Sequence, residues 1–211
     1  MRIAVYAGSF NPLHIGHLAI MRYLTEDMGF DMVYLVVSPK NPIKDTVSAD
    51  TGRERYEAAV AAVARHPELK VMVDDIELGM PAPQYTIRTL DAIAEREPGN
   101  SFTFVLGADN LADIRRWKDY GRILSDYGVA VYPRQGYDMG MTRADLMSEC
   151  VRPAVQAPAA GPAAGPAADS ACPDNGIYKI TLMENAPMVD ISSSELRAAF
   201  AAGIDASAYL M

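Results

Sequence analysis

Short runs of apolar residues alternate along this chain with segments whose apolar residues recur at helical spacing. Runs of this length that carry few polar residues are typical of strands buried on both faces of a sheet. We therefore expect each run to form a strand of a parallel sheet. The runs cover residues 3–7, 32–37, 71–73, 102–106, 129–132 and 178–182.

Between the runs, apolar residues three or four positions apart predict amphipathic helices. One set spans residues 18–28, a second spans 56–63 and a third spans 87–93. Thr51 and Glu54 have the spacing of a capping box and mark the start of the second helix. Strands that alternate with helices are joined by right-handed crossovers. The pattern therefore predicts an α/β fold with a doubly wound parallel sheet.

The alternation is interrupted at residues 153–168, where proline, alanine and glycine predominate. Such a segment has almost no side chains that bury apolar area, so we interpret it as a flexible insertion at about 153–175. A rigid polyproline spacer, or a ligand for a partner, is the alternative. At 211 residues the chain can bury one substantial core, and we expect a single domain over residues 1–211 that carries this insertion.

Composition narrows the classes of function. The net charge of -8 and the pI near 4.9 argue against a nucleic-acid or anionic-membrane surface, because such surfaces need clustered Lys and Arg. The chain has no long apolar stretch and begins without a basic leader, so we expect neither a membrane span nor secretion, and a cytoplasmic location. Cys150 and Cys172 lack the spacing of a metal site, and reduced thiols are expected.

The segment from Gly8 to His17, GSFNPLHIGH, lies between the first strand and the first helix. A turn at this place presents backbone N–H groups and a helix N-terminus to an anion. Gly8 permits a sharp turn, Gly16 removes a side chain that would block a ligand, and His14 and His17 add hydrogen-bonding or cationic tips. The alternative is that each His only pairs with a nearby backbone group. The pattern is neither the Rossmann nor the Walker motif.

A second candidate phosphate site precedes the last expected helix. Ser192 and Glu195 have capping-box spacing, Ser193 and Ser194 add hydroxyl groups, and Arg197 adds a charge one turn into the helix. Simple capping explains Ser192 and Glu195 equally well, so the spacing alone leaves both interpretations open.

Both segments resemble motifs of the HxGH nucleotidyltransferases, a family that joins a nucleoside monophosphate from ATP or CTP to a phosphate-bearing acceptor. The first resembles G-x-F-[D/N]-P-x-H-x-G-H, and the second resembles I-S-S-T-x-[I/L]-R at Ile191–Arg197. Three further segments resemble the bacterial nicotinate-mononucleotide adenylyltransferases. They are Pro83–Leu90, Leu106–Leu111 with Trp117, and Tyr132–Gly136. The resemblance covers residues 1–140 and about 177–209 and implies the Rossmann-like nucleotidyltransferase fold.

The resemblance implies adenylyl transfer from ATP to nicotinate mononucleotide, in NAD biosynthesis, with Mg²⁺ carried by ATP and no metal site of the protein's own. His14, His17, Lys44 and Arg197 would be the catalytic residues. The acceptor would be bound by Asn11, Lys44, Tyr85, Thr86, Trp117 and Arg134. ATP would be bound by Gly8, Ser9, Phe10, His14, Gly16, His17, Gly107, Asp109, Ile191, Ser192, Ser193, Ser194 and Arg197.

Several alternatives stay open. Trp117 could be an ordinary core or surface aromatic, Asp109 and Thr86 could be helix caps, and Arg134 and Lys44 could be solvated charges. The acceptor could instead be nicotinamide mononucleotide or phosphopantetheine, or the chain could be a non-catalytic ATP sensor. The sequence also leaves homo-oligomer formation open. This chain departs from the family in Asn11, where Asp is common, and in stopping at Met211, where relatives tend to continue with a short helical segment.

Overall fold

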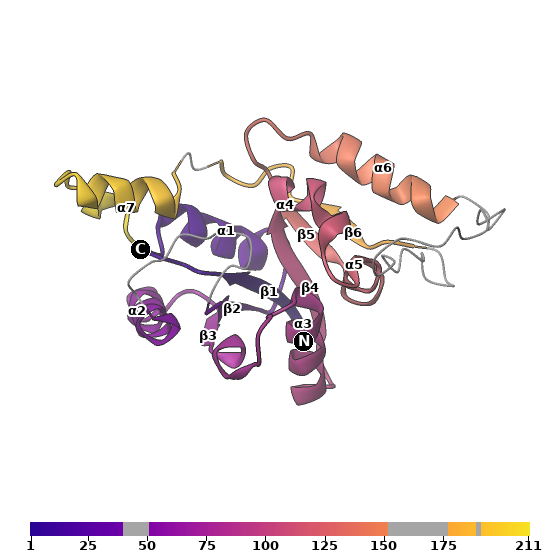
Figure 1. Ribbon diagram of the computed structural model, residues 1–211, viewed down its shortest axis with the longest axis horizontal. Helices are drawn as coiled ribbons and strands as arrows, with labels where there is room; N and C mark the ends of the chain where they lie inside the picture. Colours follow the sequence, from indigo (N-terminus) through magenta and orange to yellow (C-terminus); the bar gives the residue numbers. More distant parts are fainter. Residues whose placement is uncertain (40–50, 152–176, 189–190) are drawn as a thin grey trace, which may run out of the picture.

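The computed structural model describes residues 1–39, 51–151, 177–188 and 191–211. Its strands form one parallel sheet in the order β3-β2-β1-β4-β5-β6, which confirms the predicted doubly wound α/β fold (Figure 1). The expected insertion and Lys44 lie outside the described residues. The strands are β1 Arg2–Gly8, β2 Met32–Val37, β3 Val71–Asp74, β4 Ser101–Gly107, β5 Val129–Tyr132 and β6 Ile180–Leu182.

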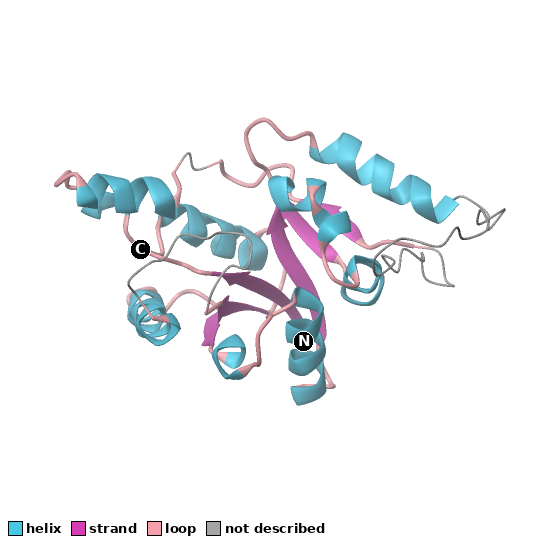
Figure 2. Cartoon of the chain, viewed as in Figure 1, coloured by secondary structure: helices cyan, strands magenta, loops and turns pink. Residues whose placement is uncertain are grey.

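Helices connect the strands and surround the sheet (Figure 2). The three helices expected in the first half of the chain and the one after Ile191 are all present. Among the longer helices, α6 was not expected from the sequence, because its apolar residues follow no clear helical period. The longer helices are α1 Ile15–Glu26, α2 Gly52–Ala64, α3 Thr86–Arg96, α6 Met139–Val151 and α7 Ser193–Ala201; short ones are η1 Ile76–Gly79, α4 Ala108–Ala112, η2 Ile114–Arg116, α5 Tyr120–Arg122, η3 Ile123–Tyr127 and η4 Ser207–Tyr209.

The sheet is buried on both faces, as its apolar strands predict. Successive residues of β1 alternate between two core clusters: Ile3 and Val5 belong to one, and Ala4 and Tyr6 to the other. The first cluster contains buried residues of α3, α4, η3 and α6, and the second contains those of α1 and α2. The apolar runs therefore lack polar alternation because neither face meets solvent.

The strand order places a crevice where the resembling motifs lie. The chain runs from β1 to β2 and β3 on one side, whereas β4, β5 and β6 extend the sheet on the other. In open α/β sheets, ligands bind at the carboxyl ends of the strands beside such a reversal. Here those ends are Gly8 of β1 and Gly107 of β4, the starts of two motif segments.

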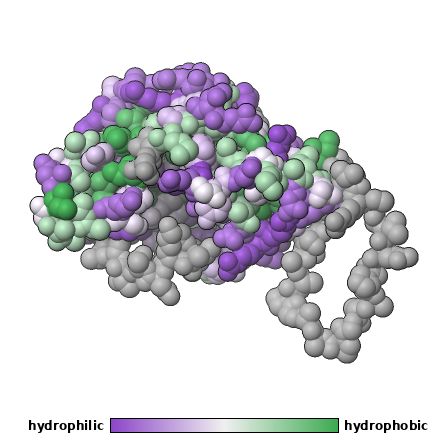
Figure 3. Space-filling model, turned by 90° about the horizontal axis from the view of Figure 1, so that it is seen from above, coloured by the Kyte–Doolittle hydropathy of each residue, from purple (hydrophilic) through white to green (hydrophobic). Residues whose placement is uncertain are grey.

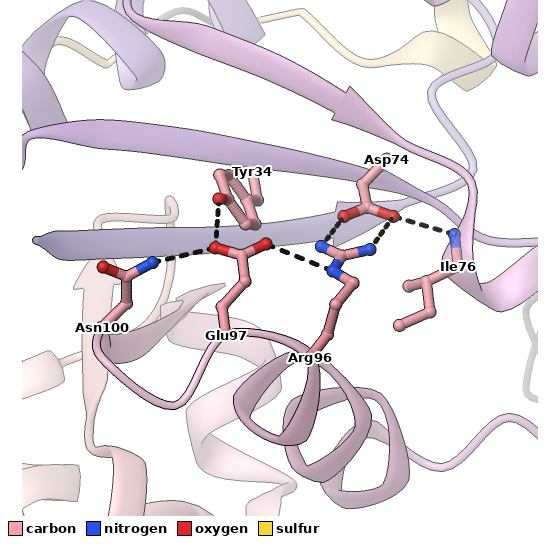
Figure 4. Close-up of polar contacts among 6 residues, drawn as sticks. All are labelled: Tyr34, Asp74, Ile76, Arg96, Glu97 and Asn100. Carbon is pink, nitrogen blue, oxygen red and sulfur yellow. Dashed lines mark hydrogen bonds and ion pairs between the residues drawn. The ribbon is translucent and has the colours of Figure 1, made fainter.

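A polar network joins the end of α3 to the sheet (Figure 4). Arg96 pairs with the buried Asp74 at 2.5 Å, and Asp74 also accepts from the N–H of Ile76. The neighbouring Glu97 accepts from the hydroxyl of Tyr34 at 2.6 Å and from Asn100. Because α3 is held at this end to both β2 and β3, its orientation on the sheet is constrained.

Cys150 is disulfide-bonded, so the expectation of a reduced thiol is wrong for this residue; spacing along the chain carries no information on whether two thiols meet in space.

Large apolar side chains are exposed near the end of α7, among them Phe200 and Ile204. Figure 3 shows hydrophobic surface at that end of the molecule.

Candidate active site

His14 and His17 together cap the N-terminus of α1. The Nδ1 atom of His14 accepts from the N–H of Gly16 at 3.1 Å, and the Nδ1 atom of His17 accepts from the N–H of His14 at 3.2 Å. The two ring centroids lie 3.8 Å apart. Since each Nδ1 is an acceptor, the proton of each neutral ring is on Nε2. The structure thus provides two Nε2–H donors side by side.

Both imidazoles are neutral near pH 7. Burial lowers the pKa of His14 to about 4, with a further contribution from the positive charge of Arg134, while Glu195 opposes the shift. Burial, His14 and Arg134 hold the pKa of His17 well below its usual value. The histidines therefore act as hydrogen-bond donors rather than as fixed cations until an anion arrives beside them.

The turn after β1 is built around Phe10, which is buried although it has the left-handed φ of 44°. Its ring packs edge-on against His17 at 5.2 Å and against Tyr6 at 5.3 Å. A Cβ atom at Gly8 would lie 3.2 Å from the Phe10 ring. A side chain at Gly8 would require the Phe10 ring to shift slightly, and that ring is in contact with His17.

Helix α7 is attached to the same turn. Ser192 caps α7 in a complete capping box with Glu195, as the spacing predicts. The hydroxyl of Ser193 donates to the carbonyl of Pro12 at 3.0 Å, and Arg197 donates to the carbonyl of Asn11 at 2.6 Å. The two candidate phosphate segments are therefore in direct contact, and Figure 1 shows α7 beside α1.

The second motif strand, β4, ends in a tight junction with α4. A Cβ atom at Gly107 would overlap Asp109 Oδ1 and lie 3.1 Å from the ring of Tyr132. Asp109 Oδ1 is buried without a hydrogen bond and lies 3.7 Å from Nε of Arg134. Gly107 thus allows Asp109 and Tyr132 to lie close to its backbone. The Oδ1 atom of Asp109 is left as an acceptor without a hydrogen-bond donor.

A cavity of about 380 Å³ lies between these parts. It brings together seven of the expected site residues, from four separate segments of the chain. They are His14, Gly16, His17, Asp109, Arg134, Ile191 and Ser192. The remaining lining residues are Tyr6, Ile20, Tyr132, Pro133, Gln135, Tyr137, Pro187 and Met188.

Other expected site residues do not line this cavity. Ser9, Phe10, Asn11, Ser193, Ser194 and Arg197 support it from the turn and from α7, as Gly8 and Gly107 do from the strand ends. Tyr85 and Thr86 begin α3, where Tyr85 provides no side-chain cap. Trp117 packs at 5.9 Å from Phe104, in contact with the core.

Three residues at or beside the cavity were not predicted from the sequence to belong to the site. Tyr6 and Tyr132 are not among the expected site residues, yet their rings lie 6.1 Å apart and line the cavity. Arg55 of α2 is buried and donates to the carbonyl of Ser9 at 2.7 Å. A charged residue in an amphipathic helix is ordinarily exposed, so nothing in the local pattern indicates this role.

The described residues contain no group of three or more His, Cys, Asp or Glu side chains that could hold a metal ion. The cavity offers imidazole N–H groups, a guanidinium and one carboxylate instead. This set suits phosphate oxygens and hydroxyl groups better than a bare cation. In the same part of the chain, no helix has the length and apolar character needed to cross a membrane.

The sequence of this chain is similar to those of known nicotinate-nucleotide adenylyltransferases. A probable nicotinate-nucleotide adenylyltransferase of Cytophaga hutchinsonii is 40% identical over 134 residues, covering 64% of this chain and 69% of the relative. Another, of Gluconacetobacter diazotrophicus, is 37% identical over 161 residues, covering 74% of this chain and 73% of the relative.

A solved structure of nicotinic acid mononucleotide adenylyltransferase from Plasmodium falciparum, complexed with NaAD, matches 98% of this chain and 87% of its own, with a TM-score of 0.69. At 17% identity this match supports the fold. Residues 5–199 match the Cytidylyltransferase-like family. With a match over nearly its whole length and relatives at this identity, the chain belongs to the cytidylyltransferase-like nucleotidyltransferases.

Proposed function

We propose that this protein transfers the adenylyl group of ATP to nicotinate mononucleotide, forming nicotinate adenine dinucleotide and pyrophosphate for NAD biosynthesis. The observation that carries the proposal is the cavity in which two Nε2–H donors, Arg134 and an Asp109 oxygen without a hydrogen bond converge. Donors for a phosphate and an acceptor for a hydroxyl group are what a nucleotide requires. The relatives named above support the choice of substrates.

The proposed reaction needs no nucleophile from the protein. An oxygen of the acceptor 5′-phosphate attacks the α-phosphorus of ATP, a new P–O bond forms, and the bond to the bridging oxygen of pyrophosphate breaks. Because both reactants are anionic, the site has to align them and to stabilise the charge that moves to the leaving group. We assign His14 and His17 to the transferred phosphoryl group, and Lys44 and Arg197 to pyrophosphate.

Asp109 is proposed to accept from the ribose hydroxyls of ATP, and its buried Oδ1 supports this role. Arg134 is proposed to bind the acceptor phosphate. Its position in the cavity, 3.7 Å from Asp109 and over the ring of Tyr132, suits a phosphate next to the nucleotide. Mg²⁺ would arrive on the ATP phosphates, where it would neutralise charge.

The pyridine end of the acceptor is proposed to lie at the start of α3. Thr86 is the first residue of that helix and Tyr85 does not cap it with its side chain, so backbone N–H groups remain for a carboxylate. Trp117 is proposed to stack on the pyridine ring, with Asn11 and Tyr85 nearby. Trp117 contacts the core at Phe104 and does not line the described cavity, so stacking requires the acceptor to extend beyond that cavity.

The test is release of pyrophosphate from ATP and nicotinate mononucleotide in the presence of Mg²⁺, for the wild type and for His17→Ala. Loss of one aimed donor typically lowers kcat about 10²- to 10³-fold, and we expect a loss in that range. His66→Ala is the matched control, because His66 pairs with Glu68 on the surface, away from the cavity. Unchanged turnover of His17→Ala would contradict the assigned role.

The acceptor is tested in the same assay with nicotinamide mononucleotide and phosphopantetheine in place of nicotinate mononucleotide. We expect the acidic mononucleotide to have the highest kcat/KM, since backbone N–H groups at a helix N-terminus favour a carboxylate. ATP binding without turnover on any acceptor would indicate a nucleotide sensor instead. We also propose a cytoplasmic location. Light scattering measures whether the protein forms a homo-oligomer.

A further inference from the structure

Arg55 has a buried side chain that the proposed reaction does not use. It lies on α2, is 5% exposed, and donates to three backbone carbonyls. Its Nη1 atom donates to the carbonyl oxygens of Ser9 and Ser38, each at 2.7 Å, and its Nη2 atom donates to that of Pro39 at 2.6 Å. Burying a guanidinium is costly unless its donors are well paired. The three carbonyls belong to the segments that leave β1 and β2.

The bond to Ser9 falls at the strained point of the turn. The carbonyl of Ser9 belongs to the peptide that also contains the N–H of Phe10, and Phe10 has a φ of 44°. A left-handed conformation is unfavourable for a bulky residue, so it persists only where its surroundings hold it. A charge-assisted hydrogen bond to this peptide fixes its plane and opposes relaxation of the turn.

The orientation of Phe10 matters because its ring packs edge-on against His17 at 5.2 Å. Helix α2 itself is held close to the same region: a Cβ atom at Gly52 would lie 3.2 Å from Cα of Pro39. Arg55 therefore extends from a helix packed against the end of β2, and it reaches the turn after β1.

We propose that Arg55 is a positioning residue: by holding the peptide between Ser9 and Phe10, it keeps the Phe10 ring against His17 and so keeps His17 aimed at the phosphate. The inference rests on the adenylyl transfer proposed above. It assigns Arg55 no contact with either substrate. Its effect is transmitted through Phe10, which a double-mutant cycle can detect.

The experiment compares Arg55→Met, which keeps the apolar stem, and Arg55→Lys, which keeps the charge, with the wild type. We expect kcat/KM for ATP to fall about 10- to 100-fold in Arg55→Met, since small misplacements near reacting groups have effects of this size. Arg55→Lys, which can still reach one carbonyl, regains part of the loss. Arg53→Ala, an exposed position on the same helix, leaves kcat/KM unchanged.

Two further measurements separate positioning from loss of stability. Leu146→Ala leaves a cavity where α6 packs on the core, and this cavity lowers the melting temperature. We expect this variant to keep the wild-type kcat. Adding Arg55→Met to Phe10→Ala changes kcat/KM by less than about threefold, because the ring through which Arg55 acts is already absent. Additive losses, or a loss in Leu146→Ala equal to that in Arg55→Met, would overturn the proposal.

The ring resonances of His17, recorded by NMR without substrates, give a readout that does not depend on turnover. They shift in Arg55→Met and stay in place in Arg53→Ala. If the wild type proves inactive with every acceptor, the proposed function fails, yet this measurement still decides whether Arg55 positions His17. Identical His17 resonances in Arg55→Met and the wild type would show that it does not.

Discussion

The Nδ1 atoms of His14 and His17 are both occupied by backbone N–H groups. The sequence predicted two imidazoles at a helix N-terminus, and it left open whether they bind phosphate or only satisfy the backbone. In the structure each Nδ1 satisfies the backbone, and because a ring has two nitrogens, each Nε2–H remains available for the phosphate contact that we propose. Pairing of Nδ1 with the backbone is what directs Nε2–H toward the cavity.

The lowered pKa of His14 predicts how stability depends on pH. Because the folded-state pKa, about 4, lies below the unfolded value of 6.5, the unfolded chain binds the additional proton between these values. The stabilisation is complete above pH 6.5 and is lost as pH falls toward 4. We expect the neutral His14 to contribute about 1–3 kcal/mol to the change, which urea unfolding at pH 7, 6, 5 and 4.5 measures.

His14→Asn provides the matched variant, because Asn is a good N-cap and does not titrate. Its unfolding free energy should fall less between pH 7 and 4.5 than that of the wild type. Part of the slope remains, since the pKa of His17 is lowered in the same direction. A variant with the full wild-type slope would rule out His14 as its source.

Among the elements, the junction of β4 and α4 illustrates what a motif glycine does. The resemblance implies that Gly107 lies beside ATP. In the structure the space beside Gly107 is filled by Asp109 and the Tyr132 ring. Sequence could not distinguish these cases, because the ring comes from β5, which follows β4 only after α4, η2, α5 and η3.

Gly107→Ala should therefore displace Asp109 and raise KM for ATP about tenfold or more, because the new methyl overlaps the carboxylate. Overpacking of this kind typically costs about 1–3 kcal/mol of stability. Gly79→Ala is the control, since a Cβ atom there meets nothing within 4 Å and its KM should stay the same. Steady-state kinetics and thermal unfolding of both variants measure the two effects. An unaltered KM in Gly107→Ala would contradict the proposed role of Asp109.

For the whole molecule, the two core clusters share the strands of one sheet, so we expect them to form together. This supports the proposal of a single domain, and it predicts one cooperative unfolding transition. Trp117, the only tryptophan, packs against the cluster on one face, so its fluorescence reports on that face. Urea curves followed by fluorescence and by far-UV circular dichroism should coincide. Two separated transitions would indicate two domains.

The sequence by itself determined the elements and the family of motifs. Strands, helix phases and the caps at Thr51 and Ser192 depend on residues within a few positions of one another, so local patterns are enough to predict them. The exception, α6, has no clear local period.

Only the tertiary structure decided which distant residues meet. Arg197 reaches the carbonyl of Asn11, 186 positions earlier, and Arg55 reaches Ser9, 46 positions earlier. Likewise, it places Trp117 against the core and outside the cavity. Such contacts depend on strand order and on the packing of helices over the sheet. Many sequences are compatible with each such contact, so no short pattern reveals it.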